Sequence, residues 1–381
     1  MARITLVVNE FDTGSETFLH ALARILGEDG HEVTQYSLRD SRTRQHAQPG
    51  RAMALPAANS ATFPWAAAKL ATRSSHASAT AMSRARARFG RSSRAVRAAL
   101  QAAPLLATRP DVVHISFSGI ALSLADAIEL LDPQTRVIVS CRGTGELVNP
   151  VLHPERAEVL SSVLNRCDRV HAVSEAVATA VVGLGVDSQL IRVIRPAVDT
   201  KKFSRRTPYQ PIQADSQIRM ITVGRLHWIK DLSTLLSAFA QLRDSGCDAQ
   251  LTIIGDGPER EALQYRAFVL RLADSVVFTG PLPPEQVREQ LERAQLFVLS
   301  SLSEGTSNAA LEAMALELPV IVTGVGGMTE VIEDGVTGWV VPPSNPAKLA
   351  ESMTRVVTNS SPAEEIGRAG RASLAKGLTL E

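Results

Sequence analysis

Short apolar runs alternate along the chain with longer stretches in which apolar residues recur every three or four positions. Residues 4–8 (ITLVV) form the first such run, and residues 16–30 form the first amphipathic stretch. Short runs rich in β-branched residues are typical of buried parallel strands, whereas the longer period is typical of helices. Strands that alternate with helices predict an α/β fold with parallel sheets wrapped by helices.

The same alternation occurs twice, once on each side of a polar segment at residues 201–217. Before this segment, further strands are expected at 31–37, 111–117, 135–143, 168–174 and 191–199. After it, the expected strands are 218–224, 249–254, 274–280 and 295–301, and the expected helices are 231–246, 259–272, 283–294 and 308–317.

The segment 201–217 contains prolines and has no apolar period, so we interpret it as an interdomain linker. A chain of 381 residues is also longer than the chains that usually fold around a single hydrophobic core. We therefore expect two Rossmann-like, doubly wound domains, residues 1–205 and 206–381, that face a cleft. In sheets of this kind ligands bind beyond the carboxyl ends of the strands.

The composition is that of a globular protein in water. Apolar residues make up 45%, charged residues 21%, and the net charge is +1. No apolar run approaches the roughly 18 residues of a transmembrane helix, and the N-terminus lacks the pattern of a signal peptide. The three cysteines are scattered (Cys141, Cys167 and Cys247), so we expect a reduced, cytoplasmic setting.

Positive charge is concentrated in residues 41–110, which contain twelve arginines and lysines and no acid. One interpretation is a solvated, alanine-rich helical region. The other is an electropositive face for an anionic lipid, a nucleic acid or a phosphorylated acceptor. Among these partners we expect an anionic membrane surface rather than nucleic acid, because aromatic side chains that could stack with bases are sparse here.

Two glutamates lie in the segment 300–322, SSLSEGTSNAALEAMALELPVIV. Glu304 precedes the expected helix and Glu312 lies inside it, so at about 1.5 Å per residue they are roughly 12 Å or less apart. A helix N-terminus, capped by Thr306 or Ser307, suits a phosphate, and Gly305 permits close approach. The two acids could then hold sugar and ribose hydroxyls. The alternative is a capping acid plus one surface glutamate.

Two cations follow the expected strand 218–224. Arg225 and Lys230 at its carboxyl end would neutralise a diphosphate leaving group without a metal. The alternative is two solvated surface cations. The sequence contains no GxxxxGK[ST], GxGxxG, HExxH or GxSxG motif and no Asp-x-Asp pair, so P-loop, dinucleotide, zinc-protease and hydrolase fingerprints are missing.

These segments resemble the family 4 glycosyltransferases, which are retaining nucleotide-sugar enzymes with the GT-B fold. The opening NEFDTGSETFLHAL is similar to the start of enzymes for colanic-acid-type and other exopolysaccharides. The resemblance covers nearly the whole chain and is carried by residues 171–203, 224–239, 251–260, 276–287 and 303–343.

The resemblance implies roles for residues of the second domain. Arg225 and Lys230 would bind the donor diphosphate, Glu304 would hold the hydroxyls of the sugar, and Glu312 would hold the ribose. Arg225, Lys230 and Glu304 would be the catalytic residues. The backbone that passes near the sugar would be that of Gly305, Thr306, Ser307, Asn308 and Ala309.

Further donor contacts are implied on other loops. Gly14 would sit near the phosphate and the reacting carbon, and the base would lie near Gly255 and the loop 278–284. Many relatives carry a histidine that touches the sugar where this chain has Arg142, which would alter donor choice; a salt-bridge role for Arg142 is the alternative. The first loop also has Thr13-Gly14-Ser15 in place of a glycine pair.

The implied reaction keeps the anomeric configuration, with attack on the face that the leaving group vacates and the leaving phosphate accepting the proton. No cofactor or metal is implied, because the nucleotide-sugar, a UDP- or GDP-sugar, is a co-substrate. The acceptor would be lipid-linked or a saccharide, in surface polysaccharide synthesis at the inner face of the plasma membrane. A soluble disaccharide or small glycoside as product, and a non-catalytic binding subunit, remain open.

Two smaller expectations complete the interpretation. The chain stops at GLTLE, so we expect the C-terminal crossover helix of the family to be short or missing. His114 and His171 occur in strand patterns, and we interpret them as hydrogen-bonded core histidines rather than as site residues.

Overall fold

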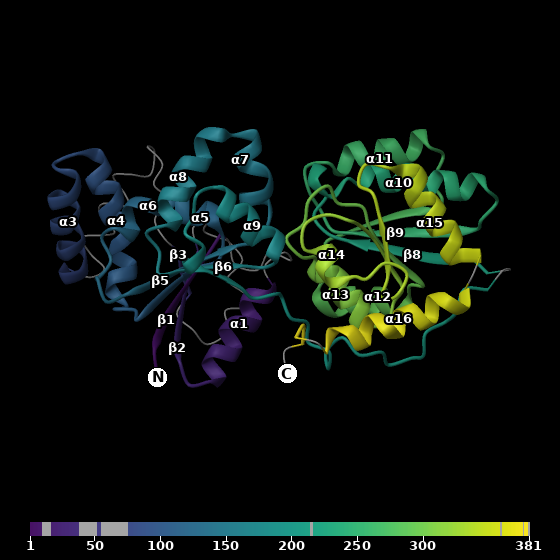
Figure 1. The fold of residues 1–381 in the computed structure, drawn as a ribbon, viewed down its shortest axis with the longest axis horizontal. Coiled ribbons are helices and arrows are strands. Elements are labelled where there is room, and N and C mark those ends of the chain that lie inside the picture. Colours follow the sequence, from purple (N-terminus) through teal and green to yellow (C-terminus); the bar gives the residue numbers. More distant parts are fainter. Residues whose placement is uncertain are drawn as a thin grey trace. The chain divides into compact units, whose positions relative to one another are not determined.

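The computed structural model describes residues 1–9, 17–37, 52–54, 75–213, 216–358, 360–375 and 377–379. The chain forms two compact units (Figure 1). The first comprises Met1–Ala172 with Ala178–Val193, and the second comprises Val173–Val177 with Ile194–Glu381.

The first unit contains a parallel sheet in the order β3-β2-β1-β4-β5-β6-β7. Chain order reverses between β1 and β4, which pair in register with Leu6 opposite His114. The inner strands are almost fully buried, as the apolar runs predict. The strands are β1 (Arg3–Val8), β2 (Glu32–Ser37), β3 (Ala52–Ala54), β4 (Val112–Ile115), β5 (Arg136–Cys141), β6 (Arg169–Ala172) and β7 (Ile191–Val193).

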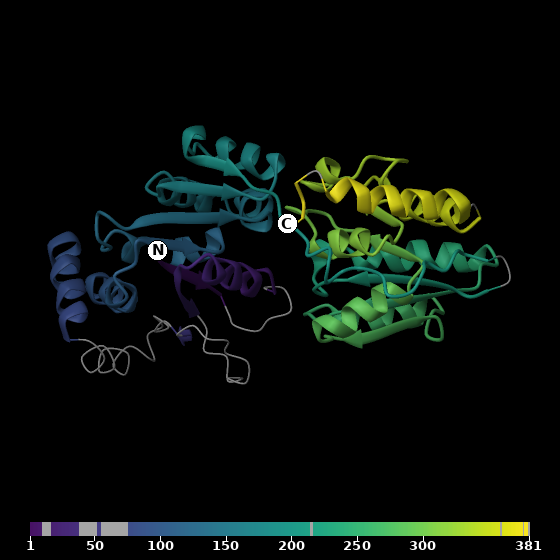
Figure 2. The same ribbon diagram turned by 90° about the horizontal axis from the view of Figure 1, so that it is seen from below.

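Helices connect these strands. They are α1 (Thr17–Glu28), α3 (Ser75–Phe89), α4 (Ser93–Ala107), α5 (Ser118–Ser123), α6 (Ala125–Ile128), α7 (Asn149–Leu152), α8 (Pro154–Leu164) and α9 (Glu175–Gly183), with a π-helical turn at Thr144–Val148 and a 3-10 turn at Ser188–Leu190. Figure 2 shows α3 and α4 side by side. Their buried alanines, among them Ala81 and Ala98, let the two helices approach closely.

The arginine-rich segment is partly neutralised within the first unit. Arg88 lies 2.6 Å from Glu129, and Arg94 lies 2.8 Å from Asp126. Arg84 donates a hydrogen bond of 2.9 Å to the carbonyl of Leu130. These three arginines therefore tie the α3–α4 pair to residues 126–132. Of the expected basic region 41–110, residues 41–51 and 55–74 lie outside the described residues.

The second unit contains a parallel sheet in the order β10-β9-β8-β11-β12-β13, and chain order reverses between β8 and β11. Helices α10, α11 and α15 cover one face, and α12, α13 and α16 cover the other (Figure 1). The strands are β8 (Ile218–Val223), β9 (Ala249–Ile254), β10 (Val276–Gly280), β11 (Leu296–Leu299), β12 (Val320–Thr323) and β13 (Trp339–Val341). The helices are α10 (Leu232–Asp244), α11 (Arg260–Val269), α12 (Pro284–Arg293), α13 (Asn308–Ala315), α14 (Met328–Val331), α15 (Pro346–Thr358) and α16 (Ser360–Leu374).

The segment interpreted as a linker is packed onto the second unit. Phe203 and Ile212 are 6% and 5% exposed and belong to its hydrophobic cores. Arg205 donates to the carbonyls of Leu316 (2.5 Å) and Glu292 (3.0 Å). The boundary therefore falls between Val193 and Ile194 rather than after residue 205, because these contacts attach the segment to the unit that follows it.

The last helix packs within the second unit. Helix α16 is 15 residues long and contacts α13, and Arg371 donates to the carbonyl of Phe203 at 3.4 Å. Val198 forms an isolated bridge with Thr379. The sequence suggests that the crossover helix is short or missing. The last helix that the structure describes is α16, at Ser360–Leu374.

Candidate functional site

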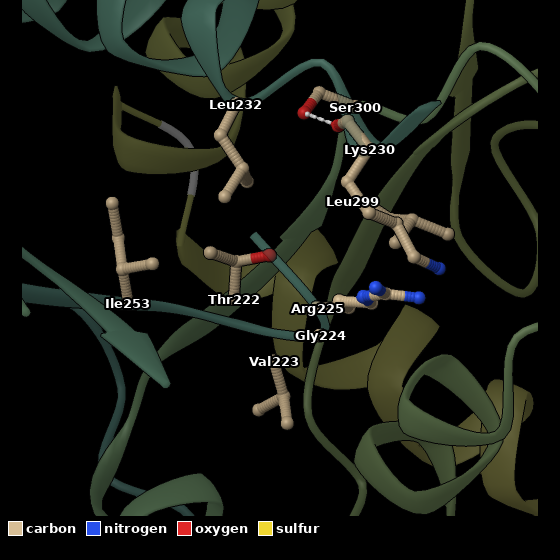
Figure 3. Close-up of a pocket in the computed structure, with 9 residues that line it drawn as sticks. All are labelled: Thr222, Val223, Gly224, Arg225, Lys230, Leu232, Ile253, Leu299 and Ser300. Atoms are coloured by element: carbon tan, nitrogen blue, oxygen red, sulfur yellow. Dashed lines mark hydrogen bonds between the residues drawn. The ribbon is translucent and has the colours of Figure 1, made fainter. Parts of the chain in front are cut away.

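The candidate site lies in the second unit, at the carboxyl edge of its sheet where chain order reverses. Gly224 and Arg225 follow β8, and Ser300 and Ser301 follow β11, the neighbouring strand. Ligands of doubly wound sheets bind at such a switch point, because the loops leave the two strands in opposite directions. A cavity opens here (Figure 3), lined by Thr222, Val223, Gly224, Arg225, Lys230, Leu232, Ile253, Leu299 and Ser300.

A 3-10 turn, Trp228–Lys230, brings the lysine to this edge. The imidazole Nδ1 of His227 accepts a hydrogen bond from the N–H of Ile229 (3.4 Å) and so caps the turn. The hydroxyl of Ser300 donates to the carbonyl of Lys230 at 2.9 Å, which ties the turn to the loop after β11. Asp231, with φ 45°, then caps helix α10. The predicted cation is therefore presented by a fixed backbone.

Lys230 and Glu304 form an ion pair. Their side chains are 21% and 10% exposed, and the hydroxyl of Ser301 also donates to Glu304 Oε1 at 2.7 Å. Arg225 is exposed, and Figure 3 shows its side chain and that of Lys230 extending toward the same side. The three residues expected to be catalytic thus gather at one point, with the lysine and the glutamate in direct contact.

Glycines let the loops around the site approach each other closely. Gly255 has φ +134°, and a Cβ there would lie 1.9 Å from the carbonyl oxygen of Gly224. Gly326 has φ +52°, and a Cβ there would lie 1.7 Å from the carbonyl oxygen of Glu304. No side chain fits at either position. Gly255 was expected near the base of the donor; what the structure shows is a close approach to Gly224 that requires a glycine.

The N-terminus of α13 lies just after Glu304. Ser307 is the N-cap, and its hydroxyl accepts from the N–H of Ala310 at 3.4 Å. Thr306, the other candidate cap, donates instead to the carbonyl of Gly305 at 2.8 Å. Asn308 and Ala309 begin the helix and are half-buried. The predicted phosphate-binding segment is therefore a helix N-terminus, as expected from its sequence.

Glu312 lies one turn inside α13 and is half-buried. Burial raises the pKa of its carboxyl to about 7, although the charge of Lys202 opposes this. Among the residues that the structure describes, no hydrogen bond or ion pair to this carboxyl is formed. A ligand that offers hydroxyl donors would satisfy it.

Two predicted donor residues, Arg142 and Gly14, precede the second unit in the chain. Arg142 belongs to the first unit, where it follows β5 and its guanidinium stands 5.9 Å from the ring centroid of Phe117. Gly14 lies outside the described residues.

A buried acid that the sequence analysis does not single out is Glu146, which is only 4% exposed in the π-helical turn after β5 of the first unit. Its carboxylate accepts from the N–H of Gly143 at 2.9 Å, at a backbone with φ 124°. Burial raises the pKa of Glu146 in spite of its hydrogen bonds. A π turn is often found at a functional site, but the signal in the sequence is only an acid four residues after Arg142.

His114 and His171 are hydrogen-bonded in the sheet, as predicted. The hydroxyl of Ser140 lies 2.8 Å from His114 Nε2 and 2.8 Å from His171 Nδ1, which links β4, β5 and β6. Burial, His171 and Arg142 lower the pKa of His114 to about 4, so its ring is neutral near pH 7.

No cluster of three or more His, Cys, Asp or Glu side chains that could hold a metal ion occurs in the residues that the structure describes. Within the same residues, none of the helices combines the length and the apolar character needed to cross a membrane.

Comparison with known protein families matches two of them along this chain. "Glycosyltransferase Family 4" matches residues 13–202, and "Glycosyl transferases group 1" matches residues 207–373. The 2-deoxystreptamine glucosyltransferase of Streptomyces kanamyceticus is 27% identical over 237 residues, 60% of this chain and 61% of that protein. A putative colanic acid biosynthesis glycosyltransferase of Salmonella typhimurium is 30% identical over 197 residues, 50% of this chain and 48% of that protein. The chain thus spans between 48% and 61% of the length of these relatives.

Solved structures share the fold across the whole chain. Sucrose-phosphate synthase from Thermosynechococcus elongatus gives a TM-score of 0.76 at 18% identity, over 100% of this chain and 95% of that one. Anabaena Alr3699/HepE in complex with UDP-glucose gives a TM-score of 0.75 at 17% identity, over 100% of this chain and 96% of that one. The predicted α/β fold with two doubly wound domains of GT-B type is confirmed.

Proposed function

Because the chain belongs to the family 4 glycosyltransferases, we propose that it transfers a sugar from a nucleotide-sugar donor to a lipid-linked or oligosaccharide acceptor. The observation that carries this proposal is the meeting of Arg225, Lys230 and Glu304 at the switch point of the second sheet. Cations beside a carboxylate match a donor that carries a diphosphate and sugar hydroxyls next to each other.

The donor would be held by its two chemically different ends. Arg225 and Lys230 would bind the diphosphate and stabilise the negative charge that it gains as the glycosidic bond breaks, a role that needs no metal. The N–H groups at the start of α13 add a partial positive charge. Glu304 would accept hydrogen bonds from sugar hydroxyls, and Glu312 from ribose hydroxyls.

The reaction would retain the anomeric configuration. In this scheme the acceptor hydroxyl attacks the anomeric carbon on the face that the phosphate leaves, and its proton passes to the departing phosphate oxygen. The new glycosidic bond forms as the bond to the phosphate breaks. Lys230 and Arg225 keep that oxygen in place throughout.

A UDP- or GDP-sugar is the proposed donor class. The Anabaena relative in structure is described as a complex with UDP-glucose, which supports a uridine nucleotide as the first to be tried. The colanic acid relative supports a role in exopolysaccharide synthesis. We place this role at the cytoplasmic face of the membrane, where exposed arginines of α3 and α4 such as Arg86 and Arg97 would face anionic lipid.

A second candidate acceptor is a small soluble molecule. The Streptomyces relative is described as a glucosyltransferase of 2-deoxystreptamine. Transfer to a soluble acceptor at full rate without membranes would favour this candidate over the lipid-linked one.

The first test is thermal stability in the presence of UDP-, GDP- and ADP-sugars. A ligand that binds only the folded protein raises the unfolding midpoint. At a concentration of about 100 times its Kd, it adds roughly 2.7 kcal/mol to the free energy of unfolding. We expect one nucleotide class to raise the midpoint of the wild type and to have no effect on Lys230→Ala.

The matched control is Lys348→Ala, because Lys348 is also paired with a glutamate, Glu351, but lies on α15 and is 56% exposed. It should keep the full shift. Equal shifts in Lys230→Ala and in the wild type would contradict the proposed donor site.

A further inference from the structure

An exposed tryptophan lies in the turn that carries Lys230. Trp228 is the first residue of the turn Trp228–Lys230, and 43% of its surface is exposed. By contrast, Trp339 is only 6% exposed in the same unit. Exposed tryptophan rings forgo the free energy that burial of so large an apolar surface supplies. A ligand that covers the rings would recover it.

The backbone that carries Trp228 is held on both sides. The adjacent Ile229 is 7% exposed, and its carbonyl accepts from the N–H of Leu302 at 2.8 Å. The carbonyl of Trp228 accepts from the N–H of Asp231 at 3.0 Å, and the backbone carbonyl of His227 accepts from the N–H of Lys230 at 2.8 Å. The ring is therefore presented from a fixed turn, so a ligand loses little by ordering it.

The neighbours of Trp228 combine an aromatic surface with positive charge. The imidazole of His227 lies 5.6 Å from the Trp228 ring, at an interplanar angle of 39°. Burial and the charge of Arg225 lower the pKa of His227, which favours the neutral form of this ring. Along the chain, His227 and Trp228 lie between Arg225 and Lys230, the two cations assigned to the diphosphate.

We propose that Trp228 is a platform for the apolar face of a sugar ring, an inference that rests on the proposed function and deepens it. One face of a pyranose exposes mainly C–H groups, which pack well on an aromatic π face, while the hydroxyls at its rim stay free for carboxylates and water. Lys230, two residues on, would hold the phosphate. The sugar comes either from the donor or from the acceptor.

The test uses calorimetric titration of four proteins: the wild type, Trp228→Ala, Trp228→Phe and Tyr265→Ala. Tyr265 is the matched control, because it is an aromatic residue 70% exposed on α11 of the same unit. The probes are UDP and UDP-glucose, or the nucleotide and nucleotide-sugar of whichever class raises the unfolding midpoint of the wild type most.

If the donor supplies the sugar, Trp228→Ala should weaken nucleotide-sugar binding by roughly five- to tenfold and leave the free nucleotide unchanged. Trp228→Phe should retain most of the affinity, and Tyr265→Ala all of it. If the acceptor supplies it, both affinities stay the same. In that case glucose, galactose or mannose, added to the wild type saturated with nucleotide-sugar, should change tryptophan fluorescence, and this change should be absent in Trp228→Phe.

Two results would overturn the inference while the proposed donor site stands. In the first, Trp228→Ala binds both nucleotide probes as the wild type does and no monosaccharide changes the fluorescence. In the second, Trp228→Ala weakens the free nucleotide as much as the nucleotide-sugar, which would make the ring a contact of the base. A wild type that binds no nucleotide-sugar would instead overturn the proposed function, and the inference with it.

Discussion

The carboxyl group of Glu312 makes the candidate site respond to pH. Its pKa is raised to about 7 by burial, so near neutral pH it changes between the neutral acid and the carboxylate. In an unfolded chain the same group ionises near its ordinary value of about 4.3. Because the folded pKa is the higher one, the folded protein binds the proton more tightly, and ionisation of Glu312 opposes folding.

We expect Glu312→Gln to stabilise the protein at pH 8 and to change little at pH 4. The stability that wild-type Glu312 contributes is fully present below about pH 4.3 and is lost as the pH rises through 7, and the amide avoids that loss. The gain at pH 8 should be about 3–4 kcal/mol, because the two pKa values differ by about 2.7 units. Urea denaturation at both pH values measures it.

The control for this substitution is Glu261→Gln, since Glu261 is exposed on α11. It should leave stability within about 0.5 kcal/mol of the wild type at either pH. A Glu312→Gln variant that is less stable than the wild type at pH 8 would mean that the carboxylate has a favourable partner.

At the scale of elements, helix α12 holds the segment 201–217, which precedes β8, through a buried ion pair and backbone hydrogen bonds that we call the clamp. Arg288 is only 1% exposed, and it pairs with Glu292 at 2.7 Å. Glu292 also accepts from the backbone N–H of Arg206 (2.5 Å) and of Thr207 (2.8 Å). Burial opposes ionisation of Glu292, yet these hydrogen bonds lower its pKa to about 2. Its charge therefore stabilises the folded state.

We expect Glu292→Gln to lower the free energy of unfolding by about 3 kcal/mol at pH 7, because it leaves the buried Arg288 without its closest anion. In the wild type this contribution is present above about pH 4.3 and is lost as the pH falls toward 2. Chemical denaturation from pH 7 to pH 3 checks both statements.

Glu285→Gln is the comparison, because Glu285 contacts the same arginine at 3.2 Å but is 50% exposed. It should cost less than about 1 kcal/mol. Equal losses for the two variants would show that burial of Glu292 does not decide the strength of the clamp.

The clamp also explains why the sequence pattern did not predict that segment 201–217 packs on the second unit. Strands such as β1, β5 and β8 were predicted because their apolar runs are buried by any parallel sheet, whatever lies around them. The segment 201–217 has no such run, and its charges suggested solvent. Its attachment depends on Glu292, which lies 85 residues after Thr207, and no local pattern shows that pairing.

At the scale of the whole molecule, the two units have separate hydrophobic cores. Leu6 is fully buried in the first unit, and the clusters around Phe239 and Phe297 belong to the second. The candidate donor residues Arg225, Lys230 and Glu304 all lie in the second unit. Binding of the donor should therefore stabilise one core and not the other.

We expect calorimetry to show two unfolding transitions, of which the nucleotide-sugar raises only one. Leu6→Ala should lower the other transition, since removal of a buried leucine side chain costs about 2–5 kcal/mol. Glu292→Gln should lower the transition that the ligand raises. A single transition that responds equally to all three changes would show that the units unfold as one.

The site itself could be predicted residue by residue but not as an arrangement. Arg225, Lys230 and the N-terminus of α13 follow from loops at the carboxyl ends of strands, and the strands were predictable. The ion pair joins residues 74 positions apart, and only the adjacency of β8 and β11 brings them together. In the first unit, the burial of Glu146 could not be predicted either, because it depends on a π turn that has no clear pattern in the sequence.

If the donor binds as proposed, the ion pair between Lys230 and Glu304 would make recognition conditional on two chemical groups at once. A simple anion that draws Lys230 away leaves a carboxylate that is 10% exposed without its counterion, and a neutral sugar that engages Glu304 does the same to the lysine. Only a molecule that presents an anion and hydroxyl groups side by side compensates both partners together. Free phosphate and free sugars, abundant in any cell, should therefore compete poorly with the intact nucleotide-sugar. In the proposed site, the pair would therefore favour a ligand that carries both groups over one that carries either group alone.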